Sequence, residues 1–173
     1  AKLTFKRFVD HNLNPQGVEP KFTEVRSVKA LAFPMITIVT AQELRDSIGL
    51  SDANEWIDRS IETIRRDHLN SELRCVLETV GPDGEFIDHF DGRALNPGHA
   101  MEGAWFIMLE GKLRGDDELV KTGLQMLDWS WERGWDEEHG GILYFADAKG
   151  LPVQEYWHDM KFWWPQNEAI IAT

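Results

Sequence analysis

The sequence predicts an all-α fold in which helical hairpins are arranged as a toroid. Apolar residues recur at helical spacing through most of the chain. The predicted helices begin at capping residues or prolines and most end at a glycine. One unit also occurs twice, because an extended hairpin leads into a proline-started helix at Pro97 and again 68 residues later at Pro165. Repeated helix pairs with polar residues at one end are typical of α-helical toroids.

The first half of the chain contains two predicted helices. The first twenty or so residues are expected to be irregular. Apolar residues then follow helical spacing from Val25 to Ile48, where Pro34 marks either a kink or a helix start, and Gly49 is a C-cap. Capping residues at 51–54 begin the next helix, which ends near Leu69.

Two β-hairpins are predicted between helices. Residues 73–80 and 85–87 are extended runs on either side of a Pro-Asp-Gly turn. Residues 141–145 and 151–153 repeat this pattern around the turn 147–150.

Three further helices are predicted in the second half. The first covers Pro97 to about Arg114 and is followed by Gly115. The second covers about Glu118 to Arg133, with Gly134 as its cap, and the third begins near Trp164-Pro165 and continues through Ile171.

The composition indicates a soluble protein with a sizeable core. Hydrophobic residues make up 42% of the chain, 8 residues are Trp, and the formal net charge is −12. This charge repels phosphate backbones and anionic lipids, so we expect neither nucleic-acid nor membrane partners. We find no apolar run of about 18 residues and no signal peptide at the start. The one cysteine, Cys75, is expected in the core, and a reducing, cytoplasmic location fits best.

The segment from Asn96 to His99 is the first candidate site. Asn96 is a favoured N-cap and Pro97 suits the first helical position, which puts His99 in the first turn. There the helix dipole disfavours the imidazolium, and a neutral histidine can act as a general base. Glu102, three residues later on the same face, could orient the ring or bind a substrate hydroxyl. The alternative is a structural histidine packed under a loop.

The segment from His158 to Glu168 is the second candidate site. It brings His158, Lys161, Trp164 and Glu168 together ahead of and within a helix. These groups could surround a sugar whose apolar face stacks on a tryptophan. The alternative is a tryptophan-rich plug of the core, with Lys161 in solvent.

A metal site is not expected. His89 and Asp91 precede the first site, but their spacing relative to His99 and Glu102 matches no strong zinc pattern. The remaining histidines are expected at the surface: His11, His68 and His139.

Three motifs in order resemble those of the N-acylglucosamine 2-epimerase family. Residues 92–105 are similar to its Gly-Arg … Pro-Gly-His-x-x-Glu-x-x-Trp segment. Residues 135–145 resemble the segment one helical pair later, and residues 160–169 are similar to its Met-Lys-x-Trp-Trp-Pro-x-x-Glu-Ala run. With a weaker similarity upstream, the resemblance extends from about Val25 to the end of the chain.

The resemblance implies an (α/α)6 barrel with its active site in the funnel between the inter-helix loops. Residues 1–173 would form the central part of this single catalytic domain, about half of the barrel. The implied reaction interconverts N-acetylglucosamine and N-acetylmannosamine, or a related aldose pair, by removing the C2 proton and returning it to the other face through an enediolate. His99 and Glu168 match catalytic or pocket residues of the family. The expected substrate-binding residues are Glu102, Trp105, Arg93, Lys161, Trp164 and His158.

Two functional residues of the family match no position of this chain: the second catalytic histidine and a substrate-binding arginine. His158 could substitute for the histidine, but relatives often lack a histidine at this point, so we interpret His158 as pocket lining. The chemistry requires no metal or organic redox cofactor. Some members respond to ATP as an effector, and homodimers are usual in the family, so both are expectations here.

Three other functions remain open. The chain could belong to an aldose–ketose isomerase of the same superfamily. A glycoside hydrolase on an (α/α)6 toroid would need two opposed carboxylates, for which Glu102, Glu168 and Asp91 are available. A non-catalytic sugar-binding or protein-interaction module would bind sugar without exchange at C2. Replacing His99 would abolish epimerisation and leave hydrolysis largely intact.

Overall fold

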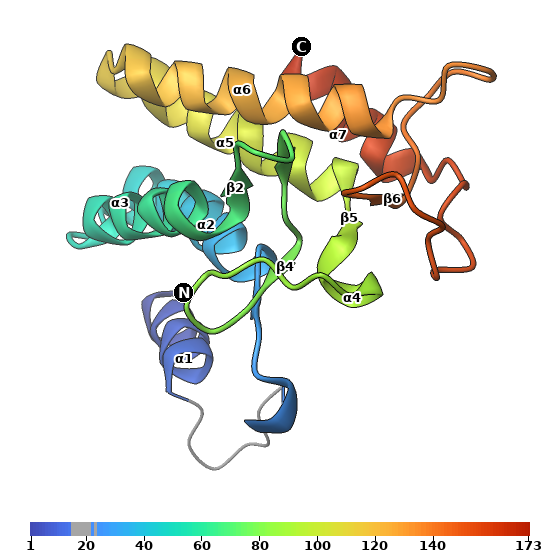
Figure 1. Cartoon of the computed structure of the whole chain (residues 1–173). Helices are drawn as coiled ribbons and strands as arrows, with labels where there is room; N and C mark the ends of the chain where they lie inside the picture. Colours follow the sequence, from blue (N-terminus) through green and yellow to red (C-terminus); the bar gives the residue numbers. More distant parts are fainter. Residues whose placement is uncertain (15–21, 23) are drawn as a thin grey trace.

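The computed structural model describes residues 1–14, 22 and 24–173. It confirms that the fold is mainly helical, with a central helix α5 (Pro97–Arg114) that packs against three others (Figure 1). Within the described residues, none of the helices has both the length and the apolar character needed to cross a membrane. The remaining long helices are α1 (Lys2–Leu13), α2 (Ala32–Ile48), α3 (Ala53–Thr63), α6 (Asp117–Gly134) and α7 (Trp163–Ala172).

Helices α5 and α6 form a close antiparallel pair. Gly123 of α6 lies against Met108 and the carbonyl of Ala104, and Gly134 at its end lies against Pro97 at the start of α5. A Cβ atom at Gly123 would stand 2.3 Å from Met108, so this approach requires glycine. The pairing brings the end of α6 beside the first turn of α5.

Helix α2 begins later than predicted. Pro34 lies in its first turn, so the proline marks a helix start rather than a kink, and Gly49 ends the helix at φ 63° as predicted. Ahead of it, residues 24–26 form a 3₁₀ turn and Lys29–Ala30 form strand β1 instead of helix. The backbone of this segment is thus used to pair with another strand.

The expectation that the first twenty or so residues are irregular is wrong for the described part. Helix α1 forms there because Phe5 and Val9, one turn apart, are both buried. The Phe5 ring meets Trp56 of α3 edge-on, with centroids 6.3 Å apart. Residues 15–21 and 23 lie outside the described residues.

The first predicted hairpin is wrong in its pairing. Strand β4 (Thr79–Val80) pairs with β1, and β3 (Cys75–Val76) pairs with β2 (Leu69–Asn70), whereas residues 85–87 form no strand. The turn at 81–84 does form, through a bond from the Gly84 N–H to the Gly81 carbonyl of 3.0 Å. One further bond crosses the turn, from the Gly81 N–H to the Glu85 carbonyl at 2.9 Å, and the chain beyond it forms no strand.

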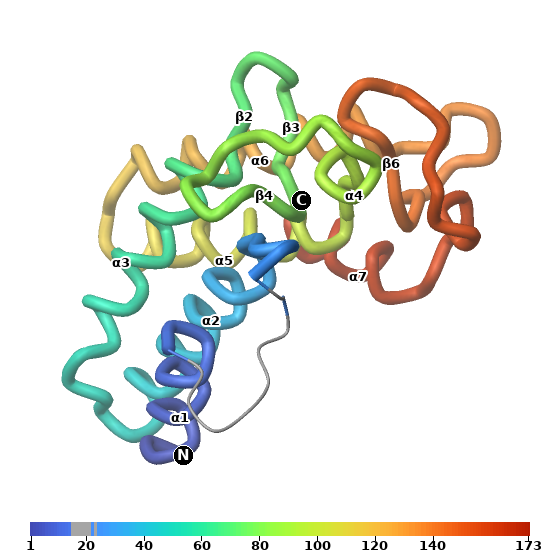
Figure 2. The backbone as a smooth tube through the Cα atoms, turned by 60° about the horizontal axis from the view of Figure 1, so that its bottom comes forward, coloured from blue at the N-terminus to red at the C-terminus, as the bar shows by residue number. Residues whose placement is uncertain are grey.

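The second predicted hairpin is also wrong in its pairing. Strand β6 (Ala146–Asp147) pairs with β5 (Ala94–Leu95), while residues 151–153 form no strand. The Asp147 carboxylate accepts bonds from the N–H groups of Lys149 and Leu151, so the chain turns away after β6. The β5–β6 ladder joins the loop before α5 to the loop before α7, and Figure 2 shows these loops gathered on one side of the molecule.

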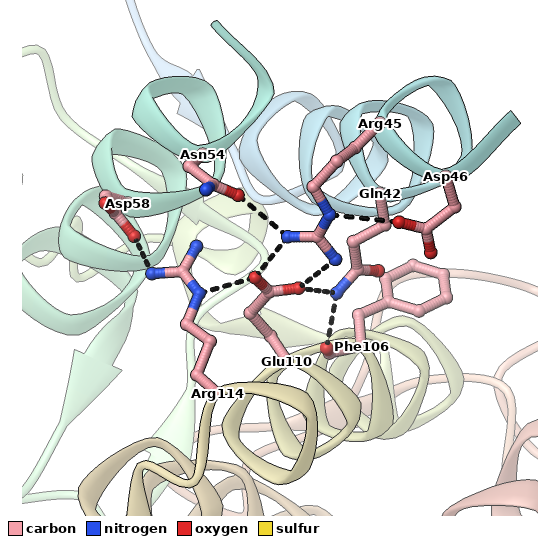
Figure 3. Close-up of polar contacts among 8 residues, drawn as sticks. All are labelled: Gln42, Arg45, Asp46, Asn54, Asp58, Phe106, Glu110 and Arg114. Atoms are coloured by element: carbon pink, nitrogen blue, oxygen red, sulfur yellow. Dashed lines mark hydrogen bonds and ion pairs between the residues drawn. The ribbon is translucent and has the colours of Figure 1, made fainter. Parts of the chain in front are cut away.

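A buried carboxylate links three helices at the other end of α5 (Figure 3). Glu110 accepts hydrogen bonds from Gln42 at 2.9 Å and Arg45 at 2.6 Å, both on α2, and from Arg114. Arg114 in turn pairs with Asp58 of α3. Burial alone would raise the pKa of Glu110, but these donors outweigh it and hold the pKa below its usual range.

Two buried side chains, His68 and Cys75, lie at the β2–β3 ladder. The expectation that His68 lies at the surface is wrong: it ends the π-helical turn Ile64–His68 and is fully buried, with its Nδ1 2.8 Å from the carbonyl of Leu77, and burial lowers its pKa. Cys75 is buried as predicted, and burial raises the pKa of its thiol to about 11.

Candidate active site

The first turn of α5 has the geometry that its sequence predicts. The Asn96 side chain accepts a hydrogen bond from the His99 N–H at 3.1 Å, and Pro97 occupies the first turn. His99 therefore stands at the N-terminal end of a long helix, beside the loops that the β5–β6 ladder joins.

Glu78 holds the His99 ring. Nδ1 of His99 lies 3.1 Å from each carboxylate oxygen of Glu78. The Glu78 backbone is fixed in turn, because its carbonyl accepts the N–H of Leu31 at 2.9 Å. Since a carboxylate only accepts hydrogen bonds, this contact puts the proton of a neutral ring on Nδ1 and leaves Nε2 as the basic nitrogen.

Trp164 forms an aromatic wall beside the histidine. The two rings lie with centroids 5.2 Å apart at 35°. Gly98 makes this contact possible, because a Cβ atom there would stand 2.7 Å from the Trp164 ring. Tyr144 also meets Trp164 edge to face, with ring centroids 6.1 Å apart. The wall is thus built from α5, α7 and the loop between α6 and α7.

Two carboxylates complete the cluster. Glu168 of α7 accepts a hydrogen bond from Nε1 of Trp105 at 2.8 Å. Glu102 is half-buried, and burial, together with the nearby charge of Glu168, raises its pKa, while His99 works in the opposite direction. A carboxyl group with a raised pKa beside a histidine is suited to proton transfer or to donating a hydrogen bond.

The structure therefore brings together five of the predicted site residues: His99, Glu102, Trp105, Trp164 and Glu168. Their roles stay predictions.

The other three predicted residues have different partners. Arg93 pairs with Asp147 at 3.0 Å and Asp88 at 3.1 Å, and so clamps the β5–β6 ladder. Lys161 pairs with Asp136, and this contact holds the pKa of Asp136 at about 2. The carbonyl of His158 accepts the N–H of Phe145 at 3.0 Å. Their proposed contact with substrate stays a prediction.

Glu78 was missed by sequence reasoning, although one signal could have found it. It directly follows three apolar residues of an extended run, Cys75 to Leu77, where a buried carboxylate is costly unless a partner neutralises it. Among the described residues there is no group of three or more His, Cys, Asp or Glu side chains placed to hold a metal ion.

Comparison with known proteins connects this geometry to one family. Residues 35–173 match the family model described as N-acylglucosamine 2-epimerase (GlcNAc 2-epimerase). The chain is 35% identical over 167 residues to N-acylglucosamine 2-epimerase of Bos taurus, which covers 92% of this chain and 38% of that protein. It is 31% identical over 160 residues to the Homo sapiens protein of the same name, covering 88% and 36% respectively. The chain thus spans little more than a third of the length of these curated relatives.

Two solved structures share the fold at low sequence identity. The cellobiose 2-epimerase from Spirochaeta thermophila DSM 6192 gives a TM-score of 0.62 at 15% identity, over 87% of this chain and 42% of that chain. A sugar epimerase from a ruminal bacterium gives 0.64 at 16% identity, over 83% and 35%.

Proposed function

Because this chain belongs to the N-acylglucosamine 2-epimerase family, we propose that it carries part of the active site of a sugar 2-epimerase. The observation that carries the proposal is the histidine at the start of α5, whose Nδ1 faces Glu78 and whose ring faces Trp164. The substrate is a small sugar, N-acetylglucosamine or N-acetylmannosamine or a related aldose pair. The name shared by the curated relatives supports this choice.

The reaction removes and returns one proton at C2 of the open-chain sugar. Nε2 of His99 takes the proton, the C–H electrons form the C1–C2 double bond, and the carbonyl oxygen becomes an enediolate oxygen. Glu78 stabilises the imidazolium that results, as a charge partner 3.1 Å from Nδ1. Return of a proton to the opposite face of C2 inverts the centre.

The remaining groups stabilise the developing negative charge and position the sugar. Glu102, whose pKa is raised, can donate a hydrogen bond to the developing oxyanion. Trp164 offers an aromatic face to the sugar, and Glu168, fixed by Trp105, can accept from its hydroxyls. We assign substrate contacts from the surrounding loops to Arg93, Lys161 and His158.

We further propose that residues 1–173 form the central part of a single (α/α)6 barrel domain. The TM-scores of 0.62 and 0.64 against longer epimerase chains support this architecture. A cytoplasmic homodimer that requires no cofactor and responds to ATP remains a proposal based on the family resemblance.

Proton exchange at C2 tests the function directly. The complete protein is incubated in D₂O with N-acetylmannosamine, N-acetylglucosamine, mannose, glucose and cellobiose in turn, and C2 is followed by NMR. We expect deuterium at C2 of one sugar and its loss in His99→Ala, by a factor on the order of 10²–10⁴. Formation of a ketose would indicate an isomerase instead. Cleavage of a glycoside that survives His99→Ala, or binding without exchange, would exclude the epimerase.

A further inference from the structure

A hollow lies outside the His99 cluster, the group formed by His99, Glu102, Trp105, Trp164 and Glu168. Its volume is about 480 Å³, within the usual range for small-molecule sites. It is formed between the helical turn α4 (Phe90–Arg93) and the loop that precedes α7. The side chains that matter below are Phe90, Asp91, Gln154, Glu155, Tyr156 and Trp157.

Aromatic rings stand exposed around this hollow. Tyr156 is 79% exposed, Trp157 46% and Phe90 38%. Tyr156 and Trp157 meet edge to face, with centroids 4.7 Å apart at 88°, so they present ring surfaces in two directions. Three aromatic side chains left in water around one cavity indicate a binding surface rather than a part of the core.

The polar groups of the hollow suit a neutral, hydroxyl-rich ligand. Asp91 is already paired with Arg26, whereas within the described residues no hydrogen bond or ion pair engages the Glu155 carboxylate. Gln154 adds an amide that can both donate and accept. An anion would meet Glu155 and a chain of net charge −12.

The hollow is connected to the His99 cluster by one short segment. Phe145 lines the hollow, and the neighbouring Tyr144 contacts Trp164. The His158 carbonyl, directly after Trp157, bonds to the Phe145 N–H. The two sites are therefore distinct but share a wall.

From these observations we infer that the hollow is a second carbohydrate site, which binds one pyranose ring of a neutral saccharide. The ring stacks on Trp157 or Tyr156, and its hydroxyls bond to Gln154 and Glu155. This inference does not depend on epimerase activity.

Methyl glycosides provide the test, because they cannot open to the aldehyde and so bind without reacting. The complete protein is labelled with 5-fluorotryptophan and titrated with methyl glucoside, methyl N-acetylglucosaminide and methyl cellobioside. Each fluorine resonance is assigned by a Trp→Phe variant. We expect a saturable shift of the Trp157 resonance with at least one glycoside. Glu155→Ala and Gln154→Ala should each weaken that binding by about tenfold, the cost of one good hydrogen bond. Trp163→Phe, an exposed tryptophan outside the hollow, is the matched control and should leave binding unchanged.

Other results would overturn the inference. A shift confined to the Trp105 and Trp164 resonances would put the sugar only at the His99 cluster. A response of Trp157 to an organic ammonium ion but to no glycoside would identify a cation site. Absence of any shift would leave no sugar site here. C2 exchange is measured separately, so the proposed epimerase function can be confirmed or excluded independently of this site.

Discussion

At the scale of the residue, Glu78 is a positioning residue for His99. We assign it no contact with the substrate. Its carboxylate selects the tautomer of the His99 ring and balances the charge of the imidazolium. Its place in the chain, between β3 and β4, explains why the ring is held firmly: the strands on both sides are paired.

Glu78→Gln should lower kcat for C2 exchange by roughly 10²-fold, with a small change in KM, because an amide N–H facing Nδ1 favours the unproductive tautomer. Nitrogen-15 NMR of the His99 ring reports the tautomer, which a purely structural role would not move. Glu132→Gln, on the exposed surface, serves as the control. An unchanged kcat together with a shifted tautomer would remove Glu78 from the mechanism.

The raised pKa of Glu102 predicts how the stability of the protein depends on pH. Its pKa is raised in the folded protein, so the unfolded chain releases this proton first, at a pKa of about 4.3. The free energy of unfolding therefore falls as pH rises from that value through the folded pKa. Glu102→Gln should unfold at higher urea concentration than the wild type above this window and at the same concentration below it, whereas catalysis should decline.

The control for this measurement is Glu138→Gln, since that side chain is 84% exposed. A Glu102→Gln protein that is less stable at every pH would mean that the carboxylate makes net favourable contacts.

At the scale of the element, two glycines of α5 make a matched pair. A Cβ atom at Gly98 would meet the Trp164 ring at 2.7 Å, whereas at Gly103 its nearest contact is Met126 at an ordinary 3.5 Å. Gly98→Ala should therefore destabilise the protein by about 1–3 kcal/mol and displace Trp164 from His99. Gly103→Ala should be neutral or stabilising by up to about 1 kcal/mol, because alanine favours helix.

Denaturant unfolding and C2 exchange measured on both variants check this prediction. Equal effects of the two substitutions would show that α7 does not pack on α5 in this way.

Most helices were predictable from neighbouring residues, although helix α1 and the local β2–β3 hairpin were missed, and pairings between distant strands were not predictable. Asn96, Pro97 and Gly115 define α5 locally, and the structure confirms that helix. The strand pairs failed because β4 finds its partner at Lys29–Ala30 and β5 finds its partner at Ala146–Asp147, far along the chain. No turn residue encodes such a partner.

The candidate site follows the same rule. His99 and Glu102 share a helix, and Trp164 and Glu168 share another, so each pair was visible in the sequence. The partner of His99, which lies 21 residues earlier between two strands, was not visible, and neither was the pairing of Arg93 with Asp147. Family resemblance, rather than periodicity, joined the two helices into one site.

At the scale of the whole molecule, part of the surface is strongly apolar. Ile170 is 73% exposed and Ile171 57%, both on α7, and Leu113 of α5 is 59% exposed. Exposed apolar surface of this kind favours association.

Residues 1–173 expressed alone should therefore self-associate and show no C2 exchange. Replacing both Ile170 and Ile171 by Thr, which keeps the branched shape, should reduce the association measured by sedimentation. A monodisperse, monomeric wild-type chain of residues 1–173 would show that these side chains do not drive association.

The β5–β6 ladder and the packing of α7 on His99 also determine when the site can exist during synthesis. Ribosomes add about 5–20 residues per second, so several seconds pass between the appearance of His99 and that of Glu168. The α5–α6 pair can dock in that interval, since its contacts are local. Until α7 emerges, the histidine ring has no aromatic wall beside it, and the nascent chain exposes the surface at Gly98 on which Trp164 later packs. A translational pause ahead of residue 163 would lengthen that exposure, and with it the time available to chaperones.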